Sequence, residues 1–365
     1  MSEEKNNRHH HSEHEYSEHE HSRKKISLFA FWAELKPVVR NGILFAIAFL
    51  LCILAIFIFK RYENRIFSDY SPEKVANAYL GETDPNELYL DGEIYTPKKN
   101  ITSYLIIGID KDGEFKASRK YDNDQQCDFL ALIVFDSDAK TYRILHINRD
   151  TMTPVNMLGV NGKVMSTRVM QIALSHTYGN GLERSCQNTA DAVSNLLFGM
   201  PVDKYYAFTM SAVGEIADFV GGVPITIEED LTEADPSFTE GAEVVLTKDT
   251  ALSFVRARME VSDGSNISRM GRQKQFIRAL MEIFDGQEDA DVFVMDAMKR
   301  IAKYSLTNAE TRDINNITES FYEYSFDGLI SPEGEAMFDG QYIQYHVDDE
   351  KLKQLVLDTF YDKKD

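Results

Sequence analysis

The cationic side chains between Phe254 and Arg278 are the first candidates for chemistry in this sequence. The segment FVRARMEVSDGSNISRMGRQKQFIR contains five arginines and one lysine against two carboxylates, although the whole chain has a formal net charge of −20. A chain this acidic repels anions at long range, so an anionic ligand can bind only where cations are concentrated. Because guanidinium groups pair with phosphate oxygens in a bidentate manner, we expect a phosphate or pyrophosphate ligand here.

Four of these arginines are predicted to converge from two neighbouring elements. Arg256 and Arg258 follow a predicted helix, and both point to one face if the chain is extended there. A second predicted helix carries Arg269, Arg272 and Gln273 in its first two turns, where the backbone N–H groups and the helix dipole also favour an anion. The alternative interpretation is an ordinary solvated helix face.

Carboxylates form the second candidate group. Asp110 directly follows the apolar run LIIGI, and Asp128 opens the next apolar run. At neighbouring strand ends, two carboxylates can share a hard divalent cation, Mg²⁺ or Mn²⁺, although caps or turn residues are the alternative. Arg149 and Asp150 follow a third apolar run, where α/β sheets bind ligands. We therefore predict Asp110, Arg149 and Asp150 as catalytic residues, with Asp110 or Asp150 as the general base.

The elements that position these residues are short apolar runs alternating with helical patterns. Runs of β-branched, aliphatic and aromatic residues predict central strands covered on both faces; they lie at 103–109, 129–135, 142–147, 205–210 and 223–227. Helical patterns are present at 167–179, 184–199 and 211–222. This alternation predicts an α/β/α sandwich around a central mixed sheet.

An apolar segment near the N-terminus predicts a single transmembrane helix, assigned to residues 42–60. From Gly42 to Phe59 the chain is uncharged for 18 residues, enough for roughly 27 Å of helix. The run starts too far from Met1 for a cleaved signal peptide. Basic residues are slightly more numerous before it, which favours a cytoplasmic N-terminus and a large extracytoplasmic part.

Four other segments complete the predicted organisation. Residues 1–41 form a His-rich arm that we expect to be cytoplasmic and disordered, and residues 61–95 form a tether. Residues 96–289 form the catalytic domain, with accessory helices and strands at 290–365. The acidic composition argues against a nucleic-acid partner. Whether Cys127 and Cys186 pair is left open by the sequence.

Several motifs together resemble the LytR-CpsA-Psr family over residues 100–285. They are, in order, LIIGID, CDFLALIVFD, LHINRDTMTPV, ALSHTYGNG, VDKYYAFTMSAVGEIADFVGGV, ALSFVRAR and SRMGRQKQ. The resemblance implies a membrane-anchored enzyme that binds a polyprenyl-pyrophosphate-linked glycopolymer. Such an enzyme transfers the glycan phosphate to the 6-hydroxyl of N-acetylmuramic acid in peptidoglycan and releases polyprenyl phosphate.

The resemblance also implies roles for individual residues. Asp110 and Asp128 would hold Mg²⁺, the apolar sheet and helices would line a tunnel for the lipid tail, and the pyrophosphate oxygens would be held by Arg149, Arg256, Arg258, Arg269 and Gln273. Two positions depart from the family pattern. Gln126 stands where an arginine is usual, with Arg119 in the same loop as a substitute, and Asn148 replaces the common proline. A non-catalytic lipid-pyrophosphate binding or regulatory protein and a pyrophosphate hydrolase are therefore the alternatives.

Overall fold

The computed structural model describes residues 93–118, 124–257 and 265–364, the backbone of Leu88–Leu90, and isolated residues between 36 and 55. Contacts within the chain define two units, Met1–Asn64 and Arg65–Asp365. The described residues contain no helix that is both long and apolar enough to span a bilayer. Most of the predicted arm, transmembrane helix and tether lies outside the described residues.

A six-stranded mixed sheet lies at the centre of the second unit. Its strand order is β11 (Ser305–Thr307), β8 (Lys204–Thr209), β3 (Ile101–Ile109), β4 (Cys127–Asp136), β5 (Thr141–Ile147) and β12 (Ser325–Ile330). The β3–β8 and β5–β12 pairs are parallel, and the other neighbours are antiparallel. The predicted central mixed sheet is therefore confirmed, and its two edge strands come from beyond residue 290.

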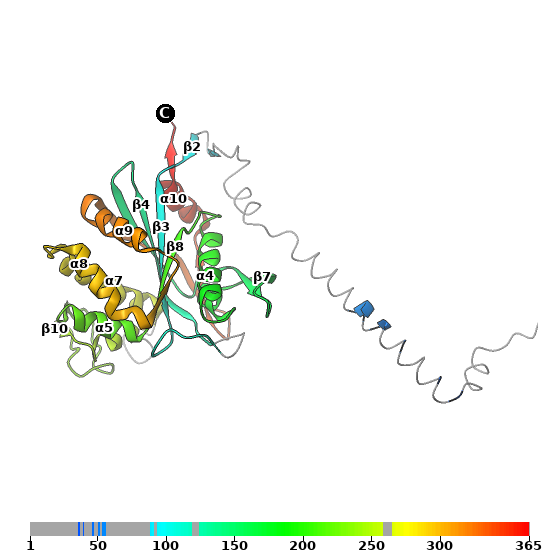
Figure 1. Cartoon of the computed structure of the whole chain (residues 1–365), viewed down its shortest axis with the longest axis horizontal. Helices are drawn as coiled ribbons and strands as arrows, with labels where there is room; N and C mark the ends of the chain where they lie inside the picture. The colour runs from blue at the N-terminus through cyan, green and yellow to red at the C-terminus, as the bar shows by residue number, and fades with distance from the viewer. Residues whose placement is uncertain are drawn as a thin grey trace, which may run out of the picture. The chain divides into compact units, whose positions relative to one another are not determined.

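Helices cover both faces of this sheet (Figure 1). On one face, Leu105, Leu132 and Leu145 pack with α4 (Glu183–Leu196) and α10 (Asp349–Phe360) in a single buried cluster. On the other, alternate residues of the same strands pack against α7 (Asn266–Asp285) and α9 (Thr311–Glu323). Because successive strand residues point to opposite faces, the near-continuous apolar runs supply both layers.

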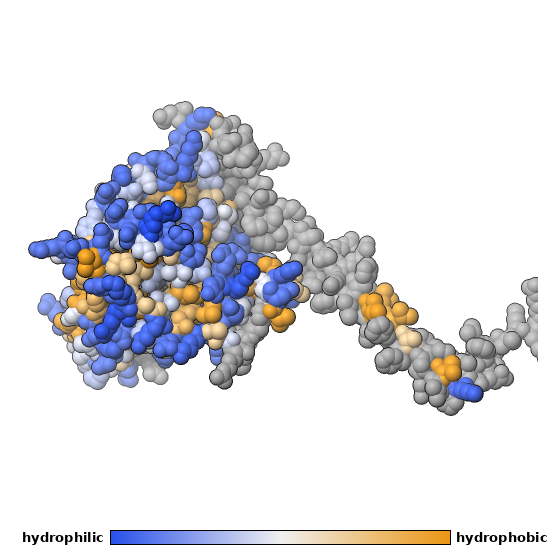
Figure 2. All heavy atoms as spheres, viewed as in Figure 1, coloured by the Kyte–Doolittle hydropathy of each residue, from blue (hydrophilic) through white to orange (hydrophobic). Residues whose placement is uncertain are grey.

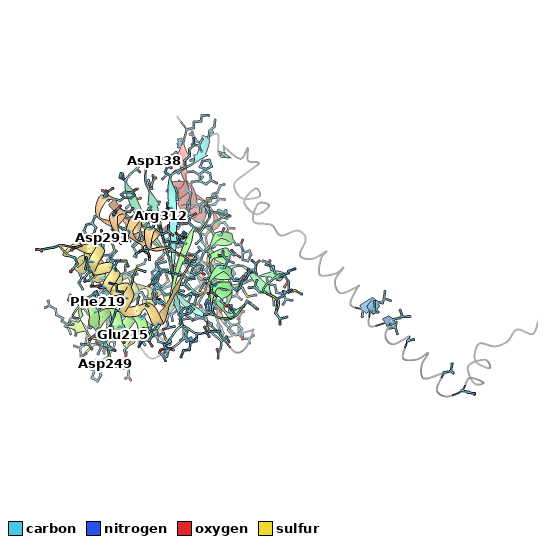
Figure 3. All side chains as sticks on the ribbon, in the orientation of Figure 1. Asp138, Glu215, Phe219, Asp249, Asp291 and Arg312 are labelled. Atoms are coloured by element: carbon cyan, nitrogen blue, oxygen red, sulfur yellow. The ribbon has the colours of Figure 1, made fainter. Side chains whose placement is uncertain are left out.

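A second group of helices adjoins α7. Helix α5 (Ser211–Phe219) packs on α8 (Ala290–Ile301), and the rings of Phe219 and Phe293 lie 5.1 Å apart. Glu215 of α5 pairs with Arg300 at 2.7 Å, on the side of the molecule where Figure 3 labels Glu215 and Phe219. The short helix α6 (Ala251–Arg256), the hairpin-like pair β9 (Val223–Thr226) and β10 (Glu243–Leu246), and α7 share a separate buried cluster with α5.

Three smaller sheets lie around this framework. Strands β6 (Met152–Leu158) and β7 (Val164–Gln171) form one hairpin, and β13 (Gly334–Phe338) and β14 (Ile343–Val347) form another. Strand β2 (Glu93–Pro97) lies between β1 (Leu88–Leu90) and the C-terminal β15 (Tyr361–Lys363). Strand β1 and part of β2 thus fall within the segment predicted as a tether. The 3₁₀ helices are η1 (Ile172–Thr177) and η2 (Ala302–Tyr304).

Some predicted elements are confirmed and others are wrong. Helix α4 matches the pattern at 184–199, and α5 ends as predicted before Gly221 and Gly222, whose φ angles are 77° and 103°. The predicted helix at 167–179 is wrong for its first half, because pairing with β6 holds these residues in β7, and the second half forms the 3₁₀ helix η1. The run at 223–227 is a strand, but it pairs with β10 outside the central sheet.

The two cysteines of the described region, Cys127 and Cys186, are both buried and unpaired. Burial raises the pKa of the Cys127 thiol to about 11. They therefore serve as small core residues between the sheet, which carries Cys127, and α4, which carries Cys186.

Candidate functional site

An irregularity between β3 and β4 positions the first two acidic residues. Gly108 lies opposite Phe129 and Ile109 lies opposite Cys127, so Asp128 is the extra residue of a β-bulge. A bulge changes the direction of a side chain. Here it leaves Cys127 in the core under α4, while Asp128 joins Phe129 on the opposite face of the sheet. Asp110, directly after β3, is tied to β4 by its N–H, which donates to the Gln126 carbonyl at 2.8 Å.

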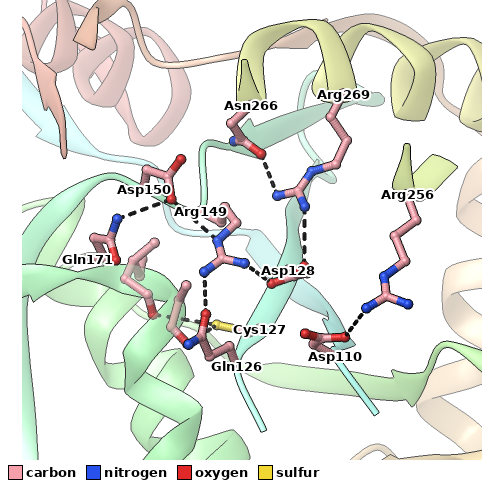
Figure 4. A network of polar contacts seen from close by, with 12 residues as sticks. Asp110, Gln126, Cys127, Asp128, Arg149, Asp150, Gln171, Arg256, Asn266 and Arg269 are labelled. Atoms are coloured by element: carbon pink, nitrogen blue, oxygen red, sulfur yellow. Dashed lines mark hydrogen bonds and ion pairs between the residues drawn. The ribbon is translucent and has the colours of Figure 1, made fainter. Parts of the chain in front are cut away.

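Two guanidinium groups bind the Asp128 carboxylate, one on each oxygen (Figure 4). Arg149, just beyond β5, donates to Oδ1, and Arg269 on α7 donates to Oδ2 at 3.2 Å. Arg256, the last residue of α6, pairs with Asp110 at 3.1 Å. Charged residues from five separate stretches of sequence therefore meet at one end of the sheet. We call Asp110, Asp128, Asp150, Arg149, Arg256 and Arg269 the Asp–Arg cluster.

Asp150 lies behind Arg149. Its side chain is almost fully buried, with Oδ1 3.4 Å from the Arg149 Nε and 3.2 Å from the Gln171 Nε2. Arg149 also donates to the Gln126 side-chain oxygen. Asp150 thus orients the Arg149 guanidinium, and Gln126 adds a hydrogen-bond acceptor where the family pattern has a cation.

A pair of asparagines supports the cluster from α7. The Asn266 side chain donates to Asn148 Oδ1 at 2.7 Å and accepts a hydrogen bond from Arg269. Asn148 Oδ1 also accepts from the Asp150 backbone N–H at 2.9 Å. The asparagine that replaces the usual proline therefore connects Arg269 on the helix to Asp150 on the sheet.

The cluster adjoins an apolar cavity of about 390 Å³. The cavity lies between the sheet and helices α5, α6 and α7. Its charged and amide lining residues are Asp128, Arg256, Arg269 and Gln273, while aliphatic and aromatic side chains such as Ile133, Phe208 and Leu280 line most of the remainder. An ordinary soluble core fills such a space. A cavity with cations in its lining suits an amphiphilic ligand with an anionic head and an apolar tail.

Not every predicted ligand-binding residue reaches the cluster. Arg272 donates instead to Glu229 and to the Ala257 carbonyl. Residues three apart are neighbours on a helix, so these partners, and not the helix geometry, direct Arg272 away from the cluster. Gln273 lines the cavity and donates to the Val255 carbonyl at 3.4 Å. Arg119 and Arg258 lie outside the described residues.

Three features of the site were missed by sequence reasoning. Asn266 and Gln171 hold the cluster together, but an asparagine beside a helix start is ordinarily a capping residue. The bulge at Asp128 leaves no mark in a continuous apolar run.

Of the residues that the structure describes, no three His, Cys, Asp or Glu side chains form a group that could hold a metal ion. The pair Asp110 and Asp128 still fits Mg²⁺, which usually takes one or two carboxylates together with phosphate oxygens and water.

Fold and site together define an α/β/α protein with an Asp–Arg cluster beside an apolar cavity. A model of the LytR-CpsA-Psr family matches residues 70–357, and the chain belongs to this family. The resemblance inferred from the motifs is thereby confirmed.

Two of the curated relatives that the chain resembles are named polyisoprenyl-teichoic acid–peptidoglycan teichoic acid transferases. TagU of Halalkalibacterium halodurans is 28% identical over 175 residues, which is 48% of this chain and 50% of that relative. TagU of Bacillus anthracis is 25% identical over 250 residues, or 68% of this chain and 75% of the relative. The match thus spans half the length of the first relative and three quarters of the second.

Solved structures share the fold. TagV of B. subtilis superposes with a TM-score of 0.53 at 19% identity, covering 72% of this chain and 96% of that chain. A structure of TagT bound to LI-WTA gives a TM-score of 0.54 at 19% identity, covering 76% of this chain and 92% of that chain. These likenesses confirm the mixed α/β fold.

Proposed function

We propose that this protein is a membrane-anchored phosphotransferase that attaches a polyprenyl-pyrophosphate-linked glycopolymer to peptidoglycan. The observation that carries the proposal is the pair of hydrogen bonds from Arg149 and Arg269 to the Asp128 carboxylate beside an apolar cavity. The cluster would bind the pyrophosphate and the cavity would take part of the prenyl chain. Family membership and the printed names of the curated relatives support this assignment.

The charges of the cluster support a divalent cation as well as a pyrophosphate. Its three arginines balance its three aspartates in the absence of ligand. A pyrophosphate with a substituent at each end adds about two negative charges, which would remain uncompensated among partly buried groups. A cation of charge two held by Asp110 and Asp128 restores the balance. Mg²⁺, or Mn²⁺ in its place, would supply charge stabilisation to the phosphate oxygens when bound.

Each residue of the cluster has a proposed task. Arg149, Arg256 and Arg269 turn from their carboxylate partners to the pyrophosphate oxygens, because guanidinium groups form bidentate pairs with phosphate as well as with carboxylate. Asp150 and Gln126 keep Arg149 oriented. Gln273, in the cavity lining, contacts the part of the ligand next to the prenyl chain.

The transfer step requires a new phosphoester bond and a proton acceptor. The acceptor hydroxyl attacks the phosphorus that bears the glycan, and the bond from this phosphorus to the bridging oxygen breaks. The electron pair leaves with the bridging oxygen, so polyprenyl phosphate departs while the arginines stabilise its charge. Asp110 is the better candidate to accept the hydroxyl proton, since its side chain is about one-third exposed (34%) whereas Asp150 is buried (3%).

The proposal places the described domain outside the cell membrane, held by a single-pass anchor at residues 42–60 with a cytoplasmic N-terminus. The 18 uncharged residues from Gly42 to Phe59 support this placement. A substrate carried on a polyprenyl chain lies at the same membrane.

A transfer assay tests the function. The full chain in detergent is incubated with Mg²⁺, a radiolabelled polyprenyl-pyrophosphate glycan and a peptidoglycan acceptor. We expect label on the acceptor, and loss of transfer after chelation with restoration by Mg²⁺. Release of labelled glycan phosphate into water would instead support a pyrophosphate hydrolase. Bound, unchanged lipid would support the binding or regulatory protein, in which Gln126 leaves the cluster one cation short.

A further inference from the structure

Exposed hydrophobic side chains are concentrated on two hairpins. Between residues 93 and 364 the described part of the chain exposes thirteen large hydrophobic side chains, and eight of them belong to these hairpins. The β6–β7 hairpin contributes Val160, Val164, Met165 and Val169, and the β13–β14 hairpin contributes Met337, Phe338, Tyr342 and Ile343. Val160 is 88% exposed and Phe338 is 70% exposed. Figure 2 shows hydrophobic atoms at the surface around β7. Concentration on this scale marks an interaction site.

The two hairpins contact each other where β6 begins and β7 ends. The Gln171 side chain at the end of β7 donates to the Ile343 carbonyl of β14 at 2.6 Å, and Thr151 bridges to Tyr345. The Tyr345 N–H donates to the Asp150 carbonyl at 2.9 Å. The two hairpins therefore adjoin the Asp–Arg cluster through Asp150 and Gln171.

The charge of the first hairpin is opposite to that of the whole chain. One residue in about six of the sequence is Asp or Glu, yet the 32 residues from 151 to 182 contain neither. The same stretch carries Lys163 and Arg168, both exposed. Arg184 of α4 lies beside the hairpin turn, because a Cβ on Gly162 would be 3.4 Å from its Nε. Exposed aliphatic groups flanked by cations without carboxylates are characteristic of segments that enter an anionic lipid interface.

The turn of the β6–β7 hairpin projects these groups. Gly162 adopts φ 72°, and the Gly159 N–H donates to the Lys163 carbonyl at 2.7 Å, which closes a tight loop with Val160 at its tip. Gly162 has the positive φ that glycine adopts without strain. The side chains of Val160 and Asn161 are consequently both exposed.

The β13–β14 hairpin differs, since it carries the exposed carboxylates Glu335 and Asp339. We propose that the β6–β7 hairpin inserts into the headgroup region of an anionic phospholipid bilayer. Residues 61–87 separate the proposed anchor from β1, and at roughly 3.3–3.6 Å per residue these 27 residues could extend to about 90–97 Å. An anchor at residues 42–60 alone would therefore fix neither the distance of the domain from the bilayer nor its orientation. Contact through the β6–β7 hairpin holds the domain against the bilayer with its cluster near the headgroups. This inference concerns membrane contact and does not depend on transferase activity.

Fluorescence quenching by the bilayer tests the proposal. The full chain with Cys52→Ser is given one labelled cysteine, at Asn161→Cys in the hairpin turn or, as a matched control, at Glu240→Cys in the exposed acidic turn before β10. Each protein is reconstituted into phosphatidylglycerol vesicles that contain nitroxide-labelled lipid. We expect quenching at position 161 to exceed that at position 240 by at least about two-fold. Replacing phosphatidylglycerol by phosphatidylcholine should reduce the difference.

A second variant separates contact by the protein from contact by the dye. Val160→Ser with Val169→Ser should lower the quenching at position 161 while leaving the melting temperature within a few degrees of the parent. Equal quenching at positions 161 and 240 would overturn the proposal. Quenching at position 161 that survives the double substitution would overturn it too, because the dye alone would then enter the lipid. Energy transfer between labelled copies would assign the β6–β7 hairpin to a second chain instead.

Discussion

The two faces of the central sheet are built from the same strands but are completed differently. Under α4 and α10, Leu105, Leu132 and Leu145 have no exposed surface, and helix side chains fill the space. Across the sheet, Ala131 and Ile133 line a cavity of about 390 Å³ beside the charged cluster. A protein that only needed stability would fill both faces. We infer that the α4 face mainly stabilises the fold and the α7 face is left open for a ligand.

The largest expected effect comes from the residue that joins the cavity to the cluster. Asp128→Asn removes the charge that positions Arg149 and Arg269 and half of the proposed metal site. Transfer should fall by about 100-fold or more, as when a transition-state hydrogen-bond donor is lost. The measurement is kcat in the transfer assay, with circular dichroism to verify the fold.

Asp138→Asn is the matched control for that change. Asp138 is exposed in the turn at the far end of β4, where Figure 3 labels it, and accepts from Asn100 at 2.9 Å. This variant should transfer at the parental rate. Comparable losses in both variants would mean that Asp128 has no special place in the chemistry.

The two arginines of α7 separate ligand binding from stability. Arg269→Gln should weaken binding of polyprenyl pyrophosphate by about 10- to 100-fold, the equivalent of one charged hydrogen bond. Arg272→Gln should leave binding nearly unchanged but lower the free energy of unfolding by about 1–3 kcal/mol, because the partly buried Ala257 carbonyl and the Glu229 carboxylate lose their donor. Affinity and urea unfolding are measured for both variants. Equal loss of affinity in the two would contradict the division of roles along α7.

Substitution of two alanines in central strands tests whether unfilled volume is present on one face of the sheet and absent on the other. Ala131→Leu on β4 extends into the cavity, whereas Ala207→Leu on β8 extends into the filled core under α4. We expect overpacking to cost about 1–3 kcal/mol at Ala207 and much less at Ala131. Ala131→Leu should instead reduce binding of the prenyl chain. Similar destabilisation by both substitutions, measured by urea unfolding, would show that the cavity closes in solution.

The sequence predicted the strands better than it predicted the difference between the faces. Five apolar runs were found, and four of them form β3, β4, β5 and β8, because continuous burial leaves a strong pattern. The same continuity hides which face is filled, since apolar residues line a cavity as readily as a core. The run at 223–227 shows the same limit, because strand propensity carries no information on the partner strand.

The site was predicted by residue type and not by geometry. Arg256 and Arg269 could be chosen because concentrated cations are unusual in so acidic a chain. Asp110, Asp128 and Arg149 could be chosen because they lie at the ends of apolar runs. The separation of Arg272 from Arg269 depends on the position of Glu229, which lies 43 residues away in sequence. The bulge at Asp128 depends on the register with β3. Long-range contacts of this kind leave no signal in one sequence.

One buried histidine lies on each side of the central sheet, and both make the stability of the protein depend on pH. Burial lowers the pKa of His146, which faces α7, to about 3, with Lys274 and Arg269 adding to the effect, and burial lowers the pKa of His176, under α4, to about 4. Both pKa values are below the usual 6.5, so the unfolded chain takes up protons first as the pH falls. Stability is then fully present above pH 6.5 and declines towards pH 4 and 3. At pH 5 each histidine should account for about 2 kcal/mol of that loss.

Replacing each histidine with leucine tests this predicted loss of stability at low pH. His176 Nδ1 is 2.9 Å from the Gln125 carbonyl oxygen, so His176→Leu should lose stability already at pH 7. His146→Leu should keep its stability at pH 7, because the ring lies among the Phe129 ring and α7 side chains. Both variants should unfold with a smaller difference between pH 7 and pH 5 than the parent, measured in urea. An unchanged difference in His146→Leu would mean that water reaches this histidine through the cavity and keeps its pKa near the ordinary value, which would make the α7 face wetter than its apolar lining implies.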